Sequence, residues 1–236
     1  GDDVIVGLNG KDWIDGKGGN DVICGGKGDD NIIAGDGNDK VFGPPPINTS
    51  DGIYLNAADT VVIIRNLIGT TADGLSALGN SGAGIYSFNT KNITIGGTTP
   101  AERNIISGNG EDGINTRFGT DNVVVLGNYI GTDINGTGEL GNVDNGVFFQ
   151  DTANASVGDG TAAGRNIIAG NDISGVRVTK TPGTTIEGNY IGTDVTGDVA
   201  MGNTLHGIYV HNSADVVVGG PAAGDRNVIA ANGVIG

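Results

Sequence analysis

The sequence predicts an all-β chain wound into a solenoid of parallel strands, and three observations carry this prediction. Aspartate recurs every nine residues from Asp3 to Asp39. Beyond residue 48, a glycine followed by Ile or Val recurs at intervals of 29 to 33 residues. Each of these longer units holds three short apolar segments. None of them keeps the 3.6-residue apolar spacing of an amphipathic helix for more than a turn.

The composition favours short strands joined by tight turns. Glycine accounts for 46 of 236 residues, well above the usual share of about 7%. The net charge of −15 argues against nucleic acid or an anionic membrane surface as partner, since either needs a basic patch. Cys24 stands alone, which excludes an internal disulfide framework. No apolar run approaches the roughly 18 residues of a membrane span.

The first element, residues 1–43, consists of nonapeptide units such as GKGGNDVIC and GGKGDDNII. These units resemble the G-G-x-G-x-D-x-U-x repeat of the RTX, or haemolysin-type, calcium-binding family. The resemblance implies a β-roll in which two units make one turn. Residues 18 apart then stack at the strand spacing of about 4.8 Å, so that Asp3 lies over Asp21 and Asp12 over Asp30.

Stacked aspartates predict a calcium site. Ionised carboxylates at that spacing repel one another, and a divalent cation removes the repulsion. Calcium suits such a site because it accepts six to eight oxygen ligands, turn carbonyls included. The predicted metal-binding residues are Asp3, Asp12, Asp21, Asp30, Asp39, Gly10, Gly19, Gly28 and Gly37.

The second element is a Pro-rich junction, residues 44–47, because Pro44 to Pro46 cannot continue a strand ladder. The third is residues 48–236, about six coils, with Gly236 at the start of a seventh. Because the chain also begins inside a repeat, we expect solenoid edges at both ends.

Each long coil contains three apolar slots, which predict three short strands and a three-sided solenoid. The first slot is Gly-Ile/Val-x-x, the second is typified by VVII at 61–64, and the third is Asn-x-Ile. An asparagine also stands four residues before each slot-one glycine, from Asn48 to Asn203, and the spacing continues at Asn232. Successive side-chain amides of this kind can hydrogen-bond as a ladder.

This region resembles the right-handed parallel β-helix class shared by pectin lyases, alginate epimerases and many bacterial surface proteins. The resemblance implies a three-sided coil whose inserted loops project from the rungs. We expect the outward column of slot three, from Leu67 to Val228, to be covered by loops or by a neighbouring molecule because it is apolar. The arginines that precede the slot-three asparagines are expected to pair with loop acids; they are Arg65, Arg103, Arg165 and Arg226.

Two groups of residues are candidates for a functional site. His206 and His211, with Asp215 nearby, are the candidate catalytic residues, predicted to lie in the turns that flank one strand. Two exposed turn histidines would leave the same pattern. The outward column of slot one supplies candidate glycan-facing residues, although ordinary cross-strand packing would give them as well. These are Tyr54, Tyr86, Phe148 and Tyr209.

The sequence therefore favours a calcium-binding, extracellular or cell-surface bacterial solenoid with a structural or adhesive role. Its expected partners are calcium and either a polysaccharide or another cell-surface protein. The alternative is a carbohydrate-active enzyme of the polysaccharide lyase or uronate epimerase type. Such an enzyme needs a base for the proton at C5, an acid for the leaving oxygen and a group that neutralises the uronate. Whether the chain is an enzyme stays open at this point.

Overall fold

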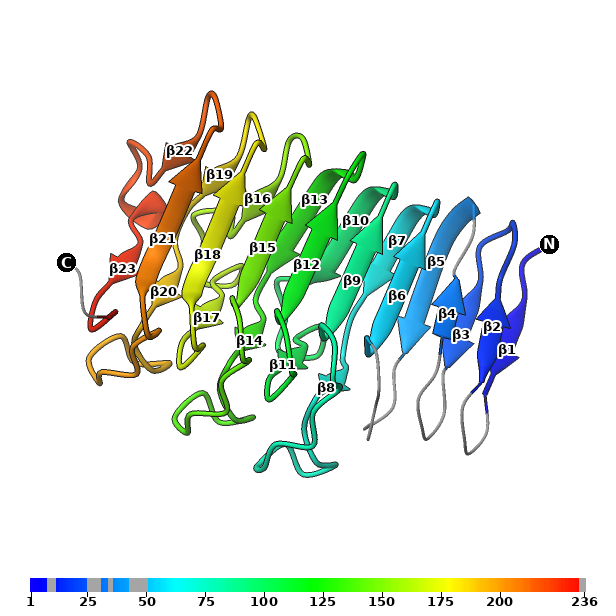
Figure 1. Ribbon diagram of the computed structural model, residues 1–236, viewed down its shortest axis with the longest axis horizontal. Helices are drawn as coiled ribbons and strands as arrows, with labels where there is room; N and C mark the ends of the chain where they lie inside the picture. The colour runs from blue at the N-terminus through cyan, green and yellow to red at the C-terminus, as the bar shows by residue number, and fades with distance from the viewer. Residues whose placement is uncertain (8–11, 25–30, 34–35, 43–50, 234–236) are drawn as a thin grey trace.

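The computed structural model describes residues 1–7, 12–24, 31–33, 36–42 and 51–233, with the backbone alone for 31–33 and 36–42. The chain winds into an elongated rod of stacked parallel strands, with the two termini at opposite ends (Figure 1). The fold is a parallel β-solenoid, as predicted. Within the described residues, the one helical segment is the short 3₁₀ turn η1 (Ala223–Asp225), and no helix is long and apolar enough to span a membrane.

Three long sheets run along the rod, and a short fourth sheet lies near the N-terminus. The nine-stranded sheet contains β1 (Val4–Val6), β3 (Val22–Cys24), β5 (Asp36–Phe42), β7 (Asp59–Ile63), β10 (Lys91–Gly96), β13 (Asp121–Leu126), β16 (Ser156–Val157), β19 (Thr185–Ile186) and β22 (Val217–Val218). The β6–β21 sheet contains β6 (Ile53–Asn56), β9 (Ile85–Phe88), β12 (Ile114–Arg117), β15 (Val147–Gln150), β18 (Ser174–Thr179) and β21 (His206–His211). The β8–β23 sheet contains β8 (Leu67–Ile68), β11 (Ile105–Ile106), β14 (Tyr129–Ile130), β17 (Ile167–Ile168), β20 (Tyr190–Ile191) and β23 (Val228–Ile229). The fourth sheet pairs β2 (Trp13–Asp15) with β4 (Asn31–Ile33).

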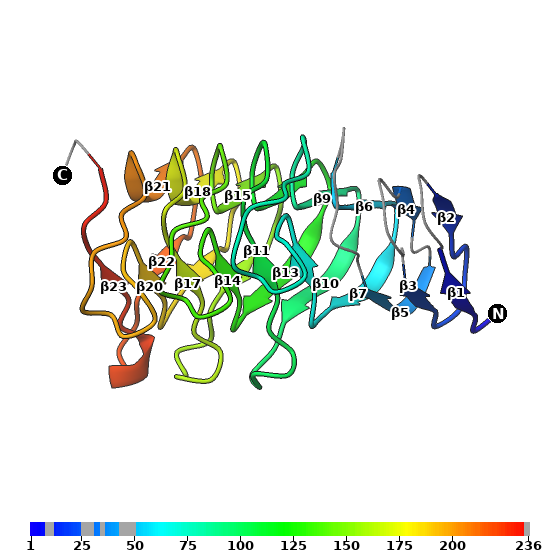
Figure 2. The ribbon, with the colours of Figure 1, turned by 90° about the horizontal axis from the view of Figure 1, so that it is seen from below.

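The nonapeptide segment and the longer coils share one continuous sheet. Strand β5 pairs with β3 on one side and with β7 on the other. Strand β4 also contacts β6, and Figure 2 shows β2 and β4 in line with β6 and β9 along one face. The Pro-rich junction at 44–47 lies outside the described residues.

The core is a column of Ile and Val side chains that runs along the rod axis. Inward positions such as Ile85, Ile93 and Ile106 are fully buried, one from each sheet of the same coil. Their register matches from coil to coil, because Ile85 pairs with Ile53 and Ile114 on the neighbouring coils. Full burial of such a side chain stabilises the fold by about 1.5–3 kcal/mol.

Two buried asparagine ladders follow two edges of the rod and confirm the predicted amide ladder. In the first, each side-chain NH₂ donates to the next Asn Oδ1 at 2.7 to 2.9 Å; its members are Asn80, Asn109, Asn142, Asn171, Asn203 and Asn232. The second repeats the pattern at 2.9 to 3.2 Å; its members are Asn66, Asn104, Asn128, Asn166, Asn189 and Asn227. Asn48 lies outside the described residues.

Loops cover the apolar outer face of the β8–β23 sheet. They follow β8, β14 and β20 and project from one edge of the rod (Figure 1). Each carries an antiparallel bridge, as between Thr132 and Glu139. Under them Ile105, Tyr129 and Ile167 are buried as a second cluster. The expected cover is therefore provided by the chain itself.

The predicted pairing of the arginines with loop acids is wrong for Arg103 and Arg165. Arg103 donates from Nε to the Gly127 carbonyl at 3.0 Å, and its guanidinium lies 4.0 Å from the centre of the Tyr129 ring. Arg165 repeats this arrangement over Tyr190 at 4.1 Å. A planar cation over an aromatic ring keeps its charge partly in water while covering apolar surface.

Candidate functional sites

The backbone register of the N-terminal coils matches the predicted 18-residue stacking. Val4 pairs with Val22, and Val22 with Lys40. Asp3 and Asp21 each stand one residue before these positions, and Asp39 stands one residue before Lys40. Asp12 directly precedes β2, on the other side of the coil. Gly10, Gly28 and Asp30 lie outside the described residues, as does the side chain of Asp39.

The described part of the predicted calcium site is built from oxygen donors. The Asp21 side chain is only 1% exposed, and its Oδ1 accepts the backbone N–H of Asp3 at 2.8 Å. Gly19 has φ +136°, and a Cβ there would collide with the Gly1 carbonyl oxygen. Glycine at this position therefore lets successive turns approach closely.

This donor set fits a calcium ion, because carboxylates and turn carbonyls are the hard oxygen ligands that calcium prefers. Asp21 and the aspartates stacked with it would hold the ion. Within the described segments, no group of three or more His, Cys, Asp or Glu side chains lies close enough together to hold a metal. The individual ligands therefore stay a prediction.

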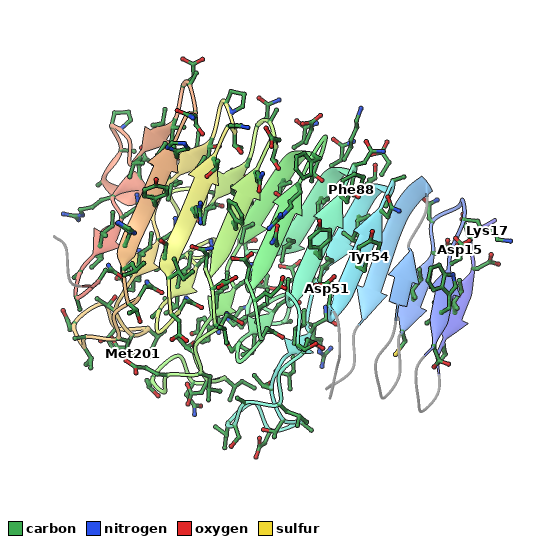
Figure 3. All side chains as sticks on the ribbon, viewed as in Figure 1. Asp15, Lys17, Asp51, Tyr54, Phe88 and Met201 are labelled. Atoms are coloured by element: carbon green, nitrogen blue, oxygen red, sulfur yellow. The ribbon has the colours of Figure 1, made fainter. Side chains whose placement is uncertain are left out.

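An outward-facing column of aromatic and cationic side chains runs along the β6–β21 sheet. Tyr54 and Tyr86 pair in register and stack with ring centres 5.6 Å apart and planes 7° apart. Further along, Arg177 lies between two rings, 4.8 Å from the centre of Phe148 and 5.5 Å from that of Tyr209. Phe148 itself lies between the Arg117 and Arg177 guanidinium groups and is only 7% exposed, so it offers little surface to a ligand. Figure 3 shows Tyr54 on the face of this sheet, with Phe88 farther along the neighbouring strand. We call this outer surface the aromatic face.

A buried carboxyl group lies at the edge of the aromatic face. Asp112 Oδ1 accepts the side-chain NH₂ of Asn145 at 2.7 Å and its backbone N–H at 3.0 Å. Asp112 Oδ2 accepts the NH₂ of Asn115 at 2.6 Å, and Asn115 Oδ1 accepts Arg117 Nε at 2.9 Å. Burial raises the pKa of Asp112 from 3.8 to about 6, although the hydrogen bonds from Asn145 oppose this shift.

A second carboxyl group, Asp51, occupies the same place at the start of β6 (Figure 3). Burial raises its pKa to about 6, with the Ala83 backbone N–H opposing the shift. Burial also raises the pKa of Tyr86, which Arg117 opposes. The aromatic face thus combines ring surfaces, guanidinium groups and carboxyls that titrate near pH 6.

In the structure His206 and His211 both lie against the Tyr209 ring, whereas Asp215 lies apart from them. Both histidines lie within β21, at its two ends, and not in the flanking turns as predicted. The Tyr209 ring lies between them, with ring centres 5.1 Å from His206 and 6.2 Å from His211. The Ser174 hydroxyl lies 3.4 Å from His206 Nδ1. Asp215 is exposed in the following turn, at φ +54°.

The sequence interpretation missed Asp51 and Asp112. A signal for them does exist, because Asp-Gly-Ile occurs at both 51–53 and 112–114. The aspartate in that motif directly precedes the slot-one strand, and so it sits at the edge of the aromatic face. Arg117 and Asn145 were missed for a different reason: their roles depend on contacts between neighbouring coils.

Comparisons with known proteins match the two parts of the chain separately. Residues 1–32 and 18–43 match the RTX calcium-binding nonapeptide repeat, so the chain carries RTX repeats at its N-terminus. Two crystal structures of mutants of the periplasmic alginate epimerase AlgG are similar to the chain as a whole. One has a TM-score of 0.52 at 16% identity and covers 85% of this chain and 43% of its own. The other has a TM-score of 0.50 at 17% identity, covering 85% and 38%.

The chain spans less than half the length of these epimerase structures. At such low identity the likeness shows the parallel β-helix fold. A comparison with curated protein sequences gives no match. The class that emerges is an RTX repeat segment joined to a parallel β-helix.

Proposed function

We propose that this protein is a calcium-binding, secreted or cell-surface solenoid with a structural and adhesive role, and that it adheres to glycans through the aromatic face. The observation that carries the proposal is the in-register aromatic column, with Tyr54 stacked on Tyr86 at 5.6 Å. These two half-buried rings turn one face toward each other, which leaves their edges and hydroxyl groups for the C–H and O–H groups of a sugar. Because Tyr54 and Tyr86 lie one coil apart, they match an extended ligand that lies along the rod.

The charges on the aromatic face favour an acidic or richly hydroxylated glycan over a neutral apolar partner. Arg117 and Arg177 supply planar donors that suit carboxylates. Asn115 and Asp112 are buried beneath this face and hold Arg117 in place, since Asn115 Oδ1 accepts Arg117 Nε and Asp112 Oδ2 accepts the Asn115 NH₂. The alternative partner is another cell-surface protein. Retardation of the chain in a gel that contains a polysaccharide would favour the glycan.

Calcium would order the N-terminal coils of this solenoid. The RTX match over residues 1–43 supports this role, as do the buried Asp21 carboxylate and the stacked register. We place the protein outside the cell or on the bacterial surface on the strength of its RTX repeats; calcium modules that work there have dissociation constants of about 10⁻⁴–10⁻³ M.

Affinity electrophoresis in gels that contain single polysaccharides tests glycan binding. The Tyr54→Ala/Tyr86→Ala variant should lose about tenfold in affinity, or about 1.4 kcal/mol, because both rings of the stack are removed. Leu75→Ala, at an exposed apolar residue on a β8 loop, is the matched control and should bind as the wild type does. If no glycan retards the wild-type chain, the glycan part of the proposal fails.

A second candidate function is a polysaccharide lyase or uronate epimerase, and Asp112 is the observation that favours it. A carboxyl with a pKa of about 6 can exchange protons near neutral pH, and Asp112, which is only 2% exposed, would have to be uncovered when a substrate binds. Arg117, linked to it through Asn115, could neutralise a uronate carboxylate. The alginate epimerase activity in the names of the structural neighbours supports testing this possibility.

Activity can be tested with alginate and pectate in the presence and absence of calcium. Ultraviolet absorbance would report unsaturated products, and proton NMR would report inversion at C5. Asp112→Asn should abolish any turnover, whereas Asp172→Asn, at an exposed residue, should not. Binding without turnover on every substrate would leave the adhesive role and remove the enzymatic one.

A further inference from the structure

A pocket of about 340 Å³ opens over β8 and β11, on a different sheet from the aromatic face. Leu67, Ile105 and Ile134 give it apolar walls, and Arg65 and Arg103 stand beside them. This volume falls in the range of small-molecule sites, which combine apolar walls with a few polar groups.

Comparison with the equivalent coils shows what opens this pocket. Leu67, Tyr129 and Tyr190 occupy equivalent positions, two coils apart in the same sheet. In the later copies the tyrosine ring fills the space under the loops: Gly136 packs against Tyr129, and Gly197 against Tyr190. Leu67 carries no ring, and in the first copy the pocket of about 340 Å³ opens beside it, with Ile134 of the next loop as one wall.

The residue before the ladder asparagine changes at the same place. It is glycine in the later copies, Gly127 with φ +65° and Gly188 with φ +74°, whereas the first copy has Arg65 with φ +61°. An arginine in the left-handed region bears a conformational cost that glycine avoids. In the first copy, therefore, Leu67 stands where the later copies have tyrosine, and Arg65 stands where they have glycine.

Arg65 and Arg103 give the pocket a positively charged rim. Glu102 turns its carboxylate to Thr99, at 3.0 Å from the N–H and 2.9 Å from the hydroxyl. Arg65 is exposed, and among the described residues no acid pairs with its guanidinium. Arg103 is held beside it by its bond to Gly127. Two neighbouring cations in a chain of net charge −15 create a local positive potential.

We propose that this pocket binds a six-membered ring that carries a carboxylate. The ring would occupy the volume that tyrosine fills in the other copies, against Leu67 and Ile105. The carboxylate would accept two parallel hydrogen bonds from the planar guanidinium group of Arg65. An aromatic acid and a sugar acid share this chemistry. The site is independent of the glycan-binding role proposed for the aromatic face.

The test is a titration of the full chain with benzoate and with glucuronate, followed by amide NMR shifts and calorimetry. Acetate and glucose serve as probes for the carboxylate alone and the ring alone. The double variant Arg65→Gly/Leu67→Tyr rebuilds the sequence of the later copies, so it should fold at least as stably as the wild type. It should bind the ring acid about tenfold more weakly or worse. Lys91→Gln, at an exposed cation on β10, should leave binding unchanged.

Binding of benzoate, of glucuronate or of both supports the proposal and identifies the kind of ring. The amide shifts should centre on residues 65–67 and 103–105. The proposal is overturned if neither ring acid binds, if acetate binds as tightly as they do, or if the double variant retains the wild-type affinity.

Discussion

At the residue scale, the turn that follows each strand of the β6–β21 sheet places one residue in the left-handed region of φ/ψ space in most coils. Asn89 and Asn212 have φ near +50°, as do Asp151 and Lys180. Ala57 has φ +54° at the equivalent place, where its backbone N–H donates to the Phe88 carbonyl at 3.1 Å. Asparagine tolerates this conformation through local hydrogen bonds, which alanine lacks.

Replacing Ala57 by Asn should therefore stabilise the fold. We expect the free energy of unfolding to rise by about 0.5 kcal/mol, because the strain is relieved without any loss of packing at this exposed site. Thermal denaturation measures the change. Ala72→Asn, on an exposed loop outside the positive-φ positions, should leave the melting temperature unchanged. A lower melting temperature for Ala57→Asn would contradict the strain argument.

Asp112 should titrate near pH 6. Its pKa is raised in the folded state from 3.8 to about 6, so the native state holds the proton more tightly than the unfolded state does. The contribution to stability is therefore fully present below about pH 3.8 and is lost as the pH rises through about 6. Carboxyl ¹³C NMR follows the titration directly.

Asn145→Ala provides the check on this pKa. The variant loses the 2.7 Å hydrogen bond to Asp112 Oδ1, which favours the charged carboxylate, and the pKa of Asp112 should rise further. Asn135→Ala, on a loop over a different sheet, should leave the titration unchanged. An Asp112 pKa that falls in Asn145→Ala would show that the hydrogen bond does not act in this way.

At the element scale, the asparagine ladder distinguishes structural amides from loop amides. Asn142 donates to Asn171 Oδ1 at 2.9 Å and to the Ile106 carbonyl at 3.0 Å, and both asparagines are fully buried. Asn142→Ala or Asn171→Ala should lower the free energy of unfolding by roughly 1–3 kcal/mol, because buried partners lose their hydrogen bonds. Asn135→Ala, whose exposed amide lies 3.3 Å from Asp133, should cost almost nothing. Chemical denaturation compares the three, and equal losses would remove the ladder from the explanation.

The strands and the ladder could be predicted from the sequence because their signals repeat. Ile93 and Val123 stand at the same point in successive coils, and the regular spacing of such residues reveals inward-facing positions. The cover of Tyr129 could not be predicted in detail, because it depends on Arg103 and on Val195 from distant loops. The Asp112 network was missed because it joins two coils: Asp112, Asn115 and Arg117 lie on one coil, and Asn145 lies on the next.

At the scale of the whole molecule, calcium should control the N-terminal coils. The chain has a single tryptophan, Trp13 on β2, and its side chain is 69% exposed. Its fluorescence therefore reports on this segment within the full chain. Addition of calcium should change the Trp13 signal and a chelator should reverse the change, because metal binding and folding are coupled in small metal-dependent segments.

Asp21→Ala should weaken calcium binding more than Asp15→Ala does. Asp21 is buried and stacked between neighbouring coils, whereas Asp15 is exposed and lies outside the nine-residue phase. Calorimetric titration of the two variants measures the difference. Equal affinity in both, or a calcium-insensitive Trp13, would falsify the calcium ladder.

The pairing of β5 with both β3 and β7 has a consequence for the order of assembly. A solenoid is nearly one-dimensional, since each coil contacts only its neighbours, and a coil adds most readily to one that is already formed. If the metal fixes the first coils, it provides a seed from which growth can proceed coil by coil toward β23. We therefore expect pulsed hydrogen exchange during refolding to show protection that spreads from β7 toward β22 when calcium is present, and no such direction when it is absent.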